Sequence, residues 1–253
     1  MSRARSSLKA ALIHLGISCA IALLCAGLVF AVWYPYPYRE IAGGRQLFSI
    51  LVAVDVVCGP LLTFILFNPI KTRRELTLDL GLVALMQLAA LGYGLWSMAQ
   101  ARPLYLAFEG DRFRVVRRAD VSLDELSQAL PAYQNLHWGS PQLLGVKLLK
   151  STDRGFIDSI EQSLVGNPPA YRPSRWVPFE GQQAVVAKNA EPLINLQKTS
   201  PKAYNTVLTW LESSQLPADD FGFLPLLGEI RSDWLVIVRK STGMPVYFVA
   251  IEE

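Results

Sequence analysis

The sequence contains few cysteines, few histidines and few charged residues, and each shortage excludes some classes of function. Its three cysteines, Cys19, Cys25 and Cys58, all lie in apolar runs of the first hundred residues. Their spacing matches neither a zinc site nor a disulfide scaffold, so we interpret them as small packing residues. The chain has two histidines and no HExxH, GxSxG, GxGxxG or Walker motif. We therefore expect no catalytic, cofactor-binding or metal-binding residue.

Charged residues make up only 18% of the chain, and the formal net charge is +3. A net charge this close to zero gives no reason to expect a nucleic-acid partner. Hydrophobic residues reach 51%, and most of the excess lies before Gln100. This uneven distribution predicts a membrane part followed by a soluble part of about 150 residues, which is long enough to bury its own core.

Three apolar runs of the first part are long enough to cross a membrane, since a spanning helix needs about 20 apolar residues. They lie at about residues 10–34, 47–67 and 77–98. The first run exceeds the core of a signal peptide, which is about 7–15 residues. It also ends in Trp-Tyr-Pro-Tyr-Pro-Tyr rather than in a small-residue cleavage pattern. We therefore expect an uncleaved helix that ends in an interfacial aromatic belt.

Basic residues in the short flanking segments indicate the orientation of these spans. The segment between the first and second spans holds Arg39 and Arg45. The N-terminal flank and the 68–76 segment together hold Arg3, Arg5, Lys9, Lys71, Arg73 and Arg74. The excess of positive charge favours the cytoplasm, so the tail is expected in the periplasm of a bacterium. If the third run were a buried amphipathic helix instead, the tail would lie in the cytoplasm.

The pattern predicts an α+β architecture, with a membrane domain of three helices over residues 1–100 and a periplasmic α+β domain over 101–253. Two pairs of β-rich runs with glycine-containing turns predict hairpins at 103–117 and 234–251 that share one sheet. Further strands are expected at 143–149 and 222–227, and helices at 153–165, 190–197 and 201–213. Ser122 and Glu125 form a capping-box pattern, which predicts a helix toward Leu130.

The second span carries the residues that most need an explanation. Asp55 lies near mid-membrane, where a carboxylate costs roughly 2.5–3.5 kcal/mol to insert and normally has a partner. Gln87 of the third span falls at a similar depth, so a hydrogen bond between the two is one expectation. Gly59-Pro60 predicts a kink that packs the bundle or opens a groove for another helix. His14, near the cytoplasmic end of the first span, is expected to reach headgroups or water.

The stretch from Asp55 to Asp120 also contains short motifs in a characteristic order. They are Asp55, Gly59-Pro60-Leu-Leu-Thr-Phe, Phe67-Asn68-Pro69, Arg74-Glu75-Leu76, Asp79-Leu80, Gln87-Leu88, Tyr93-Gly94, Ala101-Arg102-Pro103, Phe108-Glu109 and Asp111-Arg112-Phe113. In order and spacing they resemble the TfpX/TfpZ accessory proteins of type IV pilins, also called fimbrial assembly proteins. Gly243-Met-Pro-Val resembles the terminal hairpin of that family, and the resemblance is weaker elsewhere.

The resemblance implies an inner-membrane protein that affects pilin stability, pilus assembly or pilus dynamics by binding rather than catalysis. Pilins of this class hold an apolar N-terminal helix in the membrane, and Asp55, Gly59, Pro60 and Gln87 would be its contact site. The expected partners are a type IV pilin subunit, the pilus assembly machinery and membrane lipid, while the homo-oligomeric state is left open. The alternatives are a periplasmic sensor and a membrane enzyme that modifies pilin.

Overall fold

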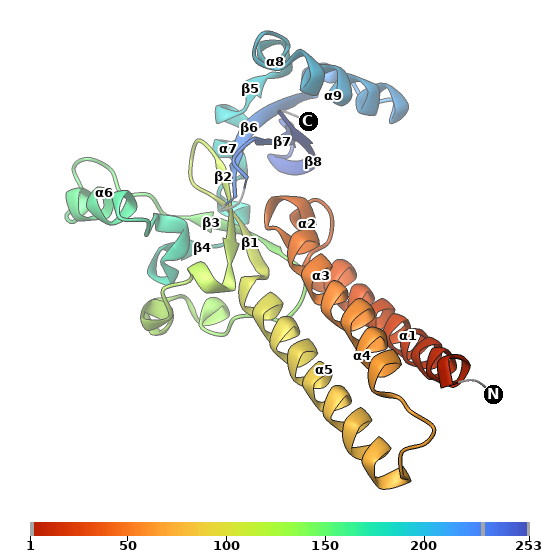
Figure 1. The fold of residues 1–253 in the computed structure, drawn as a ribbon. Coiled ribbons are helices and arrows are strands. Elements are labelled where there is room, and N and C mark those ends of the chain that lie inside the picture. The colour runs from red at the N-terminus through yellow and green to blue at the C-terminus, as the bar shows by residue number, and fades with distance from the viewer. Residues whose placement is uncertain (1–2, 229–230, 252–253) are drawn as a thin grey trace. The chain divides into compact units, whose positions relative to one another are not determined.

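The computed structural model describes residues 3–228 and 231–251, and the chain divides into two compact units (Figure 1). Unit 1 comprises Met1–Arg102 and unit 2 comprises Pro103–Glu253. The predicted domain ends at residues 1 and 253 lie outside the described residues. Unit 1 is helical and unit 2 holds a mixed sheet with helices, so the predicted α+β class is confirmed.

Over its described residues, unit 1 consists of three long helical segments joined by short connections. The first is α1 (Arg3–Leu28), which continues into a π-helical stretch at Val29–Trp33. After the short α2 (Tyr38–Ile41), the second segment combines α3 (Gly44–Val52), a π-helical stretch (Ala53–Cys58) and α4 (Gly59–Leu66). The third is α5 (Arg73–Ala101). The first and third segments extend past the predicted apolar runs, because their polar flanks are helical too.

The connection between α4 and α5 shows how the sequence ends one helix and begins the next. Asn68-Pro69 stops α4, since a residue before proline disfavours the helical conformation. Thr72 then caps α5 as a capping box: its hydroxyl accepts a hydrogen bond from the Glu75 N–H at 3.3 Å, and the Glu75 carboxylate accepts one from the Thr72 N–H at 2.8 Å.

The sheet of unit 2 contains strands from both ends of the unit. Its strands are β1 (Pro103–Phe108), β2 (Phe113–Arg117), β3 (Gln142–Val146), β4 (Trp176–Val177), β5 (Glu191–Pro192), β6 (Phe221–Leu227), β7 (Trp234–Arg239) and β8 (Met244–Ala250). Within the described residues the order is β4-β3-β1-β2-β6-β7-β8, with β5 also paired to β6. Both predicted hairpins, β1–β2 and β7–β8, are antiparallel and share this sheet, as expected. The β1–β3 and β2–β6 pairs are parallel.

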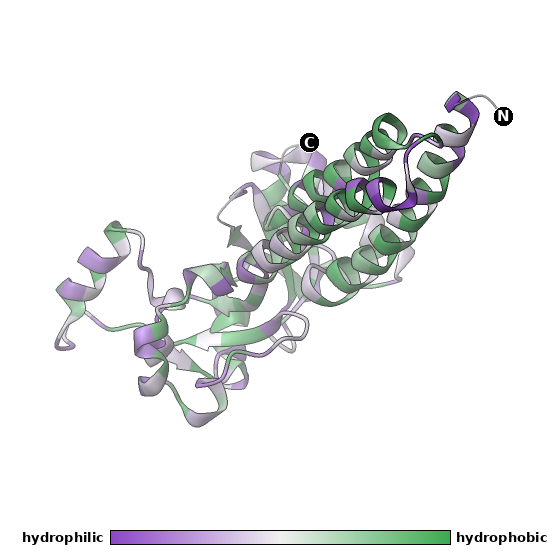
Figure 2. Ribbon diagram, turned by 60° about the horizontal axis from the view of Figure 1, so that its bottom comes forward, coloured by the Kyte–Doolittle hydropathy of each residue, from purple (hydrophilic) through white to green (hydrophobic). Residues whose placement is uncertain are grey.

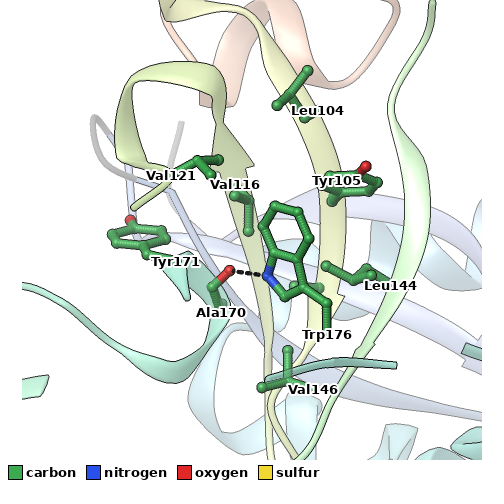
Figure 3. Close-up of a cluster of buried hydrophobic side chains, with 10 residues drawn as sticks. Leu104, Tyr105, Val116, Val121, Leu144, Val146, Ala170, Tyr171 and Trp176 are labelled. Carbon is green, nitrogen blue, oxygen red and sulfur yellow. Dashed lines mark hydrogen bonds between the residues drawn. The ribbon is translucent and has the colours of Figure 1, made fainter. Parts of the chain in front are cut away.

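Among the residues that the structure describes, two clusters of buried apolar side chains pack on the sheet. The first cluster draws all its buried members from residues 104–176 and surrounds Trp176, whose indole N–H donates to the Ala170 carbonyl at 2.8 Å (Figure 3). The buried members of the second come from residues 193–249. On its edge Trp210 stacks on Tyr247 with ring centroids 4.6 Å apart. Between the two clusters, β2 and β6 pair Phe113 with Leu226 and Arg114 with Leu227.

The helices of unit 2 are α6 (Phe156–Leu164), α7 (Gln183–Asn189), α8 (Leu193–Thr199) and α9 (Pro201–Ser213). The first, third and fourth correspond to predicted helices, whereas α7 was not predicted. Arg172 is buried and donates hydrogen bonds to Ser159 Oγ, at 2.6 Å, and to Gln162 Oε1. These bonds hold the polar side of α6, and its apolar Ile157 and Leu164 are exposed.

The predicted helix after Ser122 is wrong. Residues 123–128 form 3₁₀ turns, and no side-chain capping bond is made at their start. The hydroxyl of Ser122 instead lies 3.3 Å from Asn167 Oδ1, and the Glu125 carboxylate accepts a hydrogen bond from the Ser174 hydroxyl at 2.5 Å. Both side chains therefore bond to residues far away in the sequence instead of capping a helix. These tertiary contacts override the local preference for a helix.

Candidate functional site

Within the described residues, three helical segments are long and apolar enough to cross a membrane: Arg3–Trp33, Gly44–Leu66 and Arg73–Ala101. Hydrophobic residues cover most of their length (Figure 2). Many of the large apolar side chains are exposed, including Leu24 at 78% and Leu85 at 65%. Such exposure is unfavourable in water, whereas lipid tails contact these side chains readily. These helices therefore fit a membrane protein.

The middle segment holds unit 1 together, because the first and third segments both pack against it. On the side of α1, Ser7 Oγ donates to the Phe67 carbonyl at 2.8 Å. On the side of α5, the side-chain amide of Gln87 donates to the main-chain carbonyl of Asp55 at 3.0 Å. Polar contacts of this kind join helices where lipid supplies no competing partner.

The hydrogen bond from Gln87 compensates for Pro60. Asp55 belongs to the π-helical stretch Ala53–Cys58, and in a π-helix a carbonyl accepts from the N–H five residues later. For Asp55 that residue is Pro60, which has no N–H. The predicted break at Gly59-Pro60 therefore leaves one carbonyl open, and Gln87 of the neighbouring helix satisfies it.

Gly59 makes room for this contact. A Cβ atom at residue 59 would lie 2.0 Å from Gln87 Nε2, so the amide occupies the space that any larger residue would fill. We call the contact between the second and third segments the seam. Further along it, Gly94 of α5 lies against Leu51, and a Cβ atom added to Gly94 would lie 2.7 Å from the Leu51 Cδ1 atom. Glycine thus brings the second and third segments together at two places along their contact, as small residues do between membrane helices.

The carboxylate of Asp55 is not satisfied by Gln87. The residue is 92% buried, with a relative exposure of 8%. Among the residues that the structure describes, its Oδ1 atom is buried without a hydrogen-bond partner. The predicted pairing of Asp55 with Gln87 therefore occurs through the main chain, and among the described residues Asp55 Oδ1 stays unpaired.

Asp55 lies on the walls of two neighbouring cavities in the described part of unit 1. One, of about 210 Å³, lies among all three segments, and Asp55 is on its wall. Its lining consists of His14, Ile17, Ser18, Ile21, Ala22, Leu51, Val52, Asp55, Ala84, Gln87, Leu88 and Leu91. We call this cavity the groove. The second, of about 310 Å³, lies between α3 and α5 on residues that include Leu47, Val54, Asp55, Tyr93 and Ser97.

The sequence missed the part that α1 plays in the groove. We expected His14 to reach headgroups or water, but its Nδ1 lies 2.5 Å from Thr63 Oγ1. Asp55, Gly59 and Thr63 follow one another at a spacing of four, which places them on one face of the middle segment. From that spacing alone, a polar face on the second segment could have been predicted, together with its contact with polar residues of α1.

The structure thus brings together Asp55, Gly59 and Gln87, with Pro60 as the reason for their arrangement. In the described part of the chain, no three His, Cys, Asp or Glu side chains gather in a group that could hold a metal ion. Among the described residues of unit 1, the groove therefore combines a largely apolar wall with the buried, unpaired Oδ1 atom of Asp55.

Comparison with known proteins identifies the family. The chain is 38% identical over 233 residues to the fimbrial assembly protein of serogroup I from Dichelobacter nodosus, covering 92% of this chain and 90% of the relative. The serogroup E1 protein of the same organism is 37% identical with the same coverage. The chain belongs to the fimbrial assembly protein family. This confirms the family resemblance that the motifs between Asp55 and Asp120 indicated.

Two further comparisons agree with this family. The profile of the fimbrial assembly protein FimB matches residues 2–43. A fimbrial assembly protein of serogroups C1 and C2 from Dichelobacter nodosus is 47% identical over 117 residues, which are 46% of this chain and 89% of the relative. No solved structure matches the chain.

Proposed function

We propose that this fimbrial assembly protein is a multi-pass protein of the bacterial inner membrane that helps to build type IV pili. The names of its relatives support a role in assembly, and three apolar helices support the membrane. The N-terminus is cytoplasmic and unit 2 periplasmic, because the basic residues that flank the spans are more numerous on the N-terminal and 68–76 side.

The protein acts by binding a type IV pilin subunit rather than by catalysis. The observation that carries this proposal is the groove, a largely apolar hollow among three membrane helices with one unsatisfied acceptor in its wall. The apolar N-terminal helix of a pilin matches the polarity of this wall, and side chains of that helix can enter the groove while the pilin waits in the membrane. Held there, the subunit is kept for assembly, and the same contact can influence pilus extension or retraction.

Photo-crosslinking in intact membranes tests the contact directly. A photoreactive residue replaces Leu88, which lines the groove and is 62% exposed, or Met86, which does not line it and is 59% exposed. The two positions match in exposure and differ in the face that they occupy. We expect pilin to crosslink from position 88 and not from position 86. Equal crosslinking from both, or none from either, would contradict a pilin site in the groove.

Deletion of the gene tests the role in the cell, with surface pili counted and pilin blotted in strains with and without the retraction motor. Loss of pilin from whole cells in both backgrounds would indicate that the protein stabilises the subunit. Pilin that persists, with pili restored only when retraction is blocked, would indicate control of assembly dynamics. Unchanged pili in both would refute the proposed function, and a changed pilin mass would favour a modifying enzyme.

A further inference from the structure

The carboxylate of Asp55 defines what an occupant of the groove must supply. The residue is 92% buried, its Oδ1 has no partner among the described residues, and it forms part of the groove wall. Gln87 of α5 does not donate a hydrogen bond to this carboxylate, because its amide donates to the main-chain carbonyl of Asp55 instead. The side chain of His14 contacts Thr63 instead. Thr63 lies eight residues after Asp55 on the same helix, which is roughly 12 Å away at 1.5 Å per residue.

Lipid is a poor occupant for this groove. Acyl chains can fill the apolar part of the wall, but they carry no hydrogen-bond donor and leave the Asp55 acceptor unsatisfied. Unpaired polar groups are unfavourable at this depth, and acidic residues in membrane helices normally find a partner. A protein helix can supply both the apolar surface and the donor.

The depth of Asp55 fixes where that donor must be. Asp55 is the middle residue of Gly44–Leu66, about eleven residues and therefore roughly 16 Å from either end. We propose that the groove selects a single membrane helix that carries a side-chain hydrogen-bond donor near the midpoint of its apolar run. A hydroxyl, an amide or a protonated carboxyl group meets this requirement. The inference rests on the proposed function, and it adds the chemical feature by which the pilin helix is recognised.

The test uses the full-length protein in native membranes, with the photoreactive residue at position 88 and pilin as the partner. Asp55→Leu removes the acceptor, whereas Asp55→Asn keeps a carbonyl oxygen of the same reach. From the mean and maximum strength of an interhelical hydrogen bond, we expect Asp55→Leu to lower the amount of crosslinked pilin roughly three-fold and at most about eighteen-fold. We expect Asp55→Asn to stay within about twofold of the unmodified protein.

Two controls separate recognition from folding. Asp79→Leu also removes an acid from a membrane helix, but Asp79 pairs with Lys71 and does not line the groove. We expect it to keep the crosslink. On the pilin side, each polar residue of the apolar helix is replaced by leucine in turn. One replacement near the middle should reproduce the loss and add nothing to Asp55→Leu.

The outcomes distinguish the inference from the function on which it rests. Undiminished crosslinking of pilin by Asp55→Leu, or loss from Asp79→Leu to the same extent, would overturn the donor requirement while the pilin site stands. A crosslink from position 88 to a second copy of this chain, instead of to pilin, would overturn both. Loss with Asp55→Leu alone, matched by one mid-helix pilin position, establishes the recognition.

Discussion

The side-chain amide of Gln87 donates its hydrogen bond to the backbone of Asp55 and not to its carboxylate. The sequence predicted a single hydrogen bond between these residues, whereas in the structure the backbone carbonyl and the carboxylate of Asp55 have different roles. The main-chain bond stabilises the contact between the second and third segments, while Asp55 Oδ1 has no hydrogen-bond partner among the described residues. The two roles can therefore be changed independently by mutation.

Gln87→Leu should lower the free energy of unfolding of unit 1 by about 0.6 kcal/mol and by at most about 1.7 kcal/mol, the mean and the maximum measured for hydrogen bonds between membrane helices. The reason is that the Asp55 carbonyl loses its donor. Titration of the full-length protein with SDS in mixed micelles, followed by tryptophan fluorescence, measures this. Pro60→Ala restores a backbone N–H at residue 60, so the same glutamine change should cost less in that background. An equal cost in both backgrounds would contradict compensation of Pro60 by Gln87.

Gly59→Ala should destabilise unit 1 by about 1 kcal/mol, because the new methyl group displaces the Gln87 amide and breaks the same hydrogen bond. Gly81→Ala is the matched control, since a Cβ at residue 81 meets no atom within 4 Å. The control should be neutral or slightly stabilising, as alanine favours the helix. The same SDS titration reports both, and equal effects would show that Gly59 has no special place in the seam.

Gly243→Ala should destabilise unit 2. Gly243 has a φ of +66°, which disfavours residues with a side chain, and a Cβ there would lie 2.2 Å from the Gln183 carbonyl oxygen. Gly166, with a φ of +88° and nothing within 4 Å of an added Cβ, isolates the backbone strain alone. We expect Gly243→Ala to lower the thermal midpoint by more than Gly166→Ala. A ranking in the opposite order would be evidence against the contact of this turn with Gln183.

Arg172→Met should release α6. The guanidinium donates to Ser159 and Gln162 of that helix, so its loss leaves the polar side of α6 without this attachment. Hydrogen exchange of the amides in 156–164 should accelerate more than elsewhere in unit 2. Arg154→Met removes an exposed arginine of the same region and serves as the control. Uniform acceleration across the unit would instead indicate general destabilisation.

Tyr105 should make unit 2 lose stability at high pH. Burial, with a smaller contribution from nearby Tyr133, raises the pKa of Tyr105 to about 12 from an ordinary value near 10. Because the folded protein holds the phenolic proton more tightly, this contribution is complete below about pH 10 and is lost as the pH rises to about 12. The difference in the free energy of unfolding between the wild type and Tyr105→Phe should shrink over this interval by up to about 3 kcal/mol. A constant difference, measured by urea unfolding, would contradict the shift.

Elements with a strong local signal were predictable from the sequence. Both hairpins, α6 and α9 follow from alternating or helical apolar spacing, and Gly243 lies in the turn before β8 as that pattern requires. The failures have long-range causes. Ser122 and Glu125 bind Asn167 and Ser174 instead of capping a helix, and no local pattern reveals such partners.

The candidate site was predictable in its members but not in its geometry. A polar residue in each of two apolar runs pointed to Asp55 and Gln87, and their depths agreed. The use of the backbone carbonyl follows from the π-helical register before Pro60, which a count of helical turns does not reveal. The contribution of α1 to the groove depends on how three helices pack, and a single sequence carries little information about that.

The division of unit 2 into two clusters has a consequence for the order in which the chain folds. Each cluster takes its buried members from a continuous part of the sequence, 104–176 and 193–249, so each can condense without waiting for the other. The β2–β6 pair, whose partners Phe113 and Leu226 are 113 positions apart, has to close a long loop, so we expect it to form after the two clusters. Synthesis starts at the N-terminus, so β2 is made before β6, and we expect one edge of β2 to stay unpaired during that interval. An unpaired strand edge favours misfolding and aggregation, so this interval is the one in which unit 2 is most vulnerable.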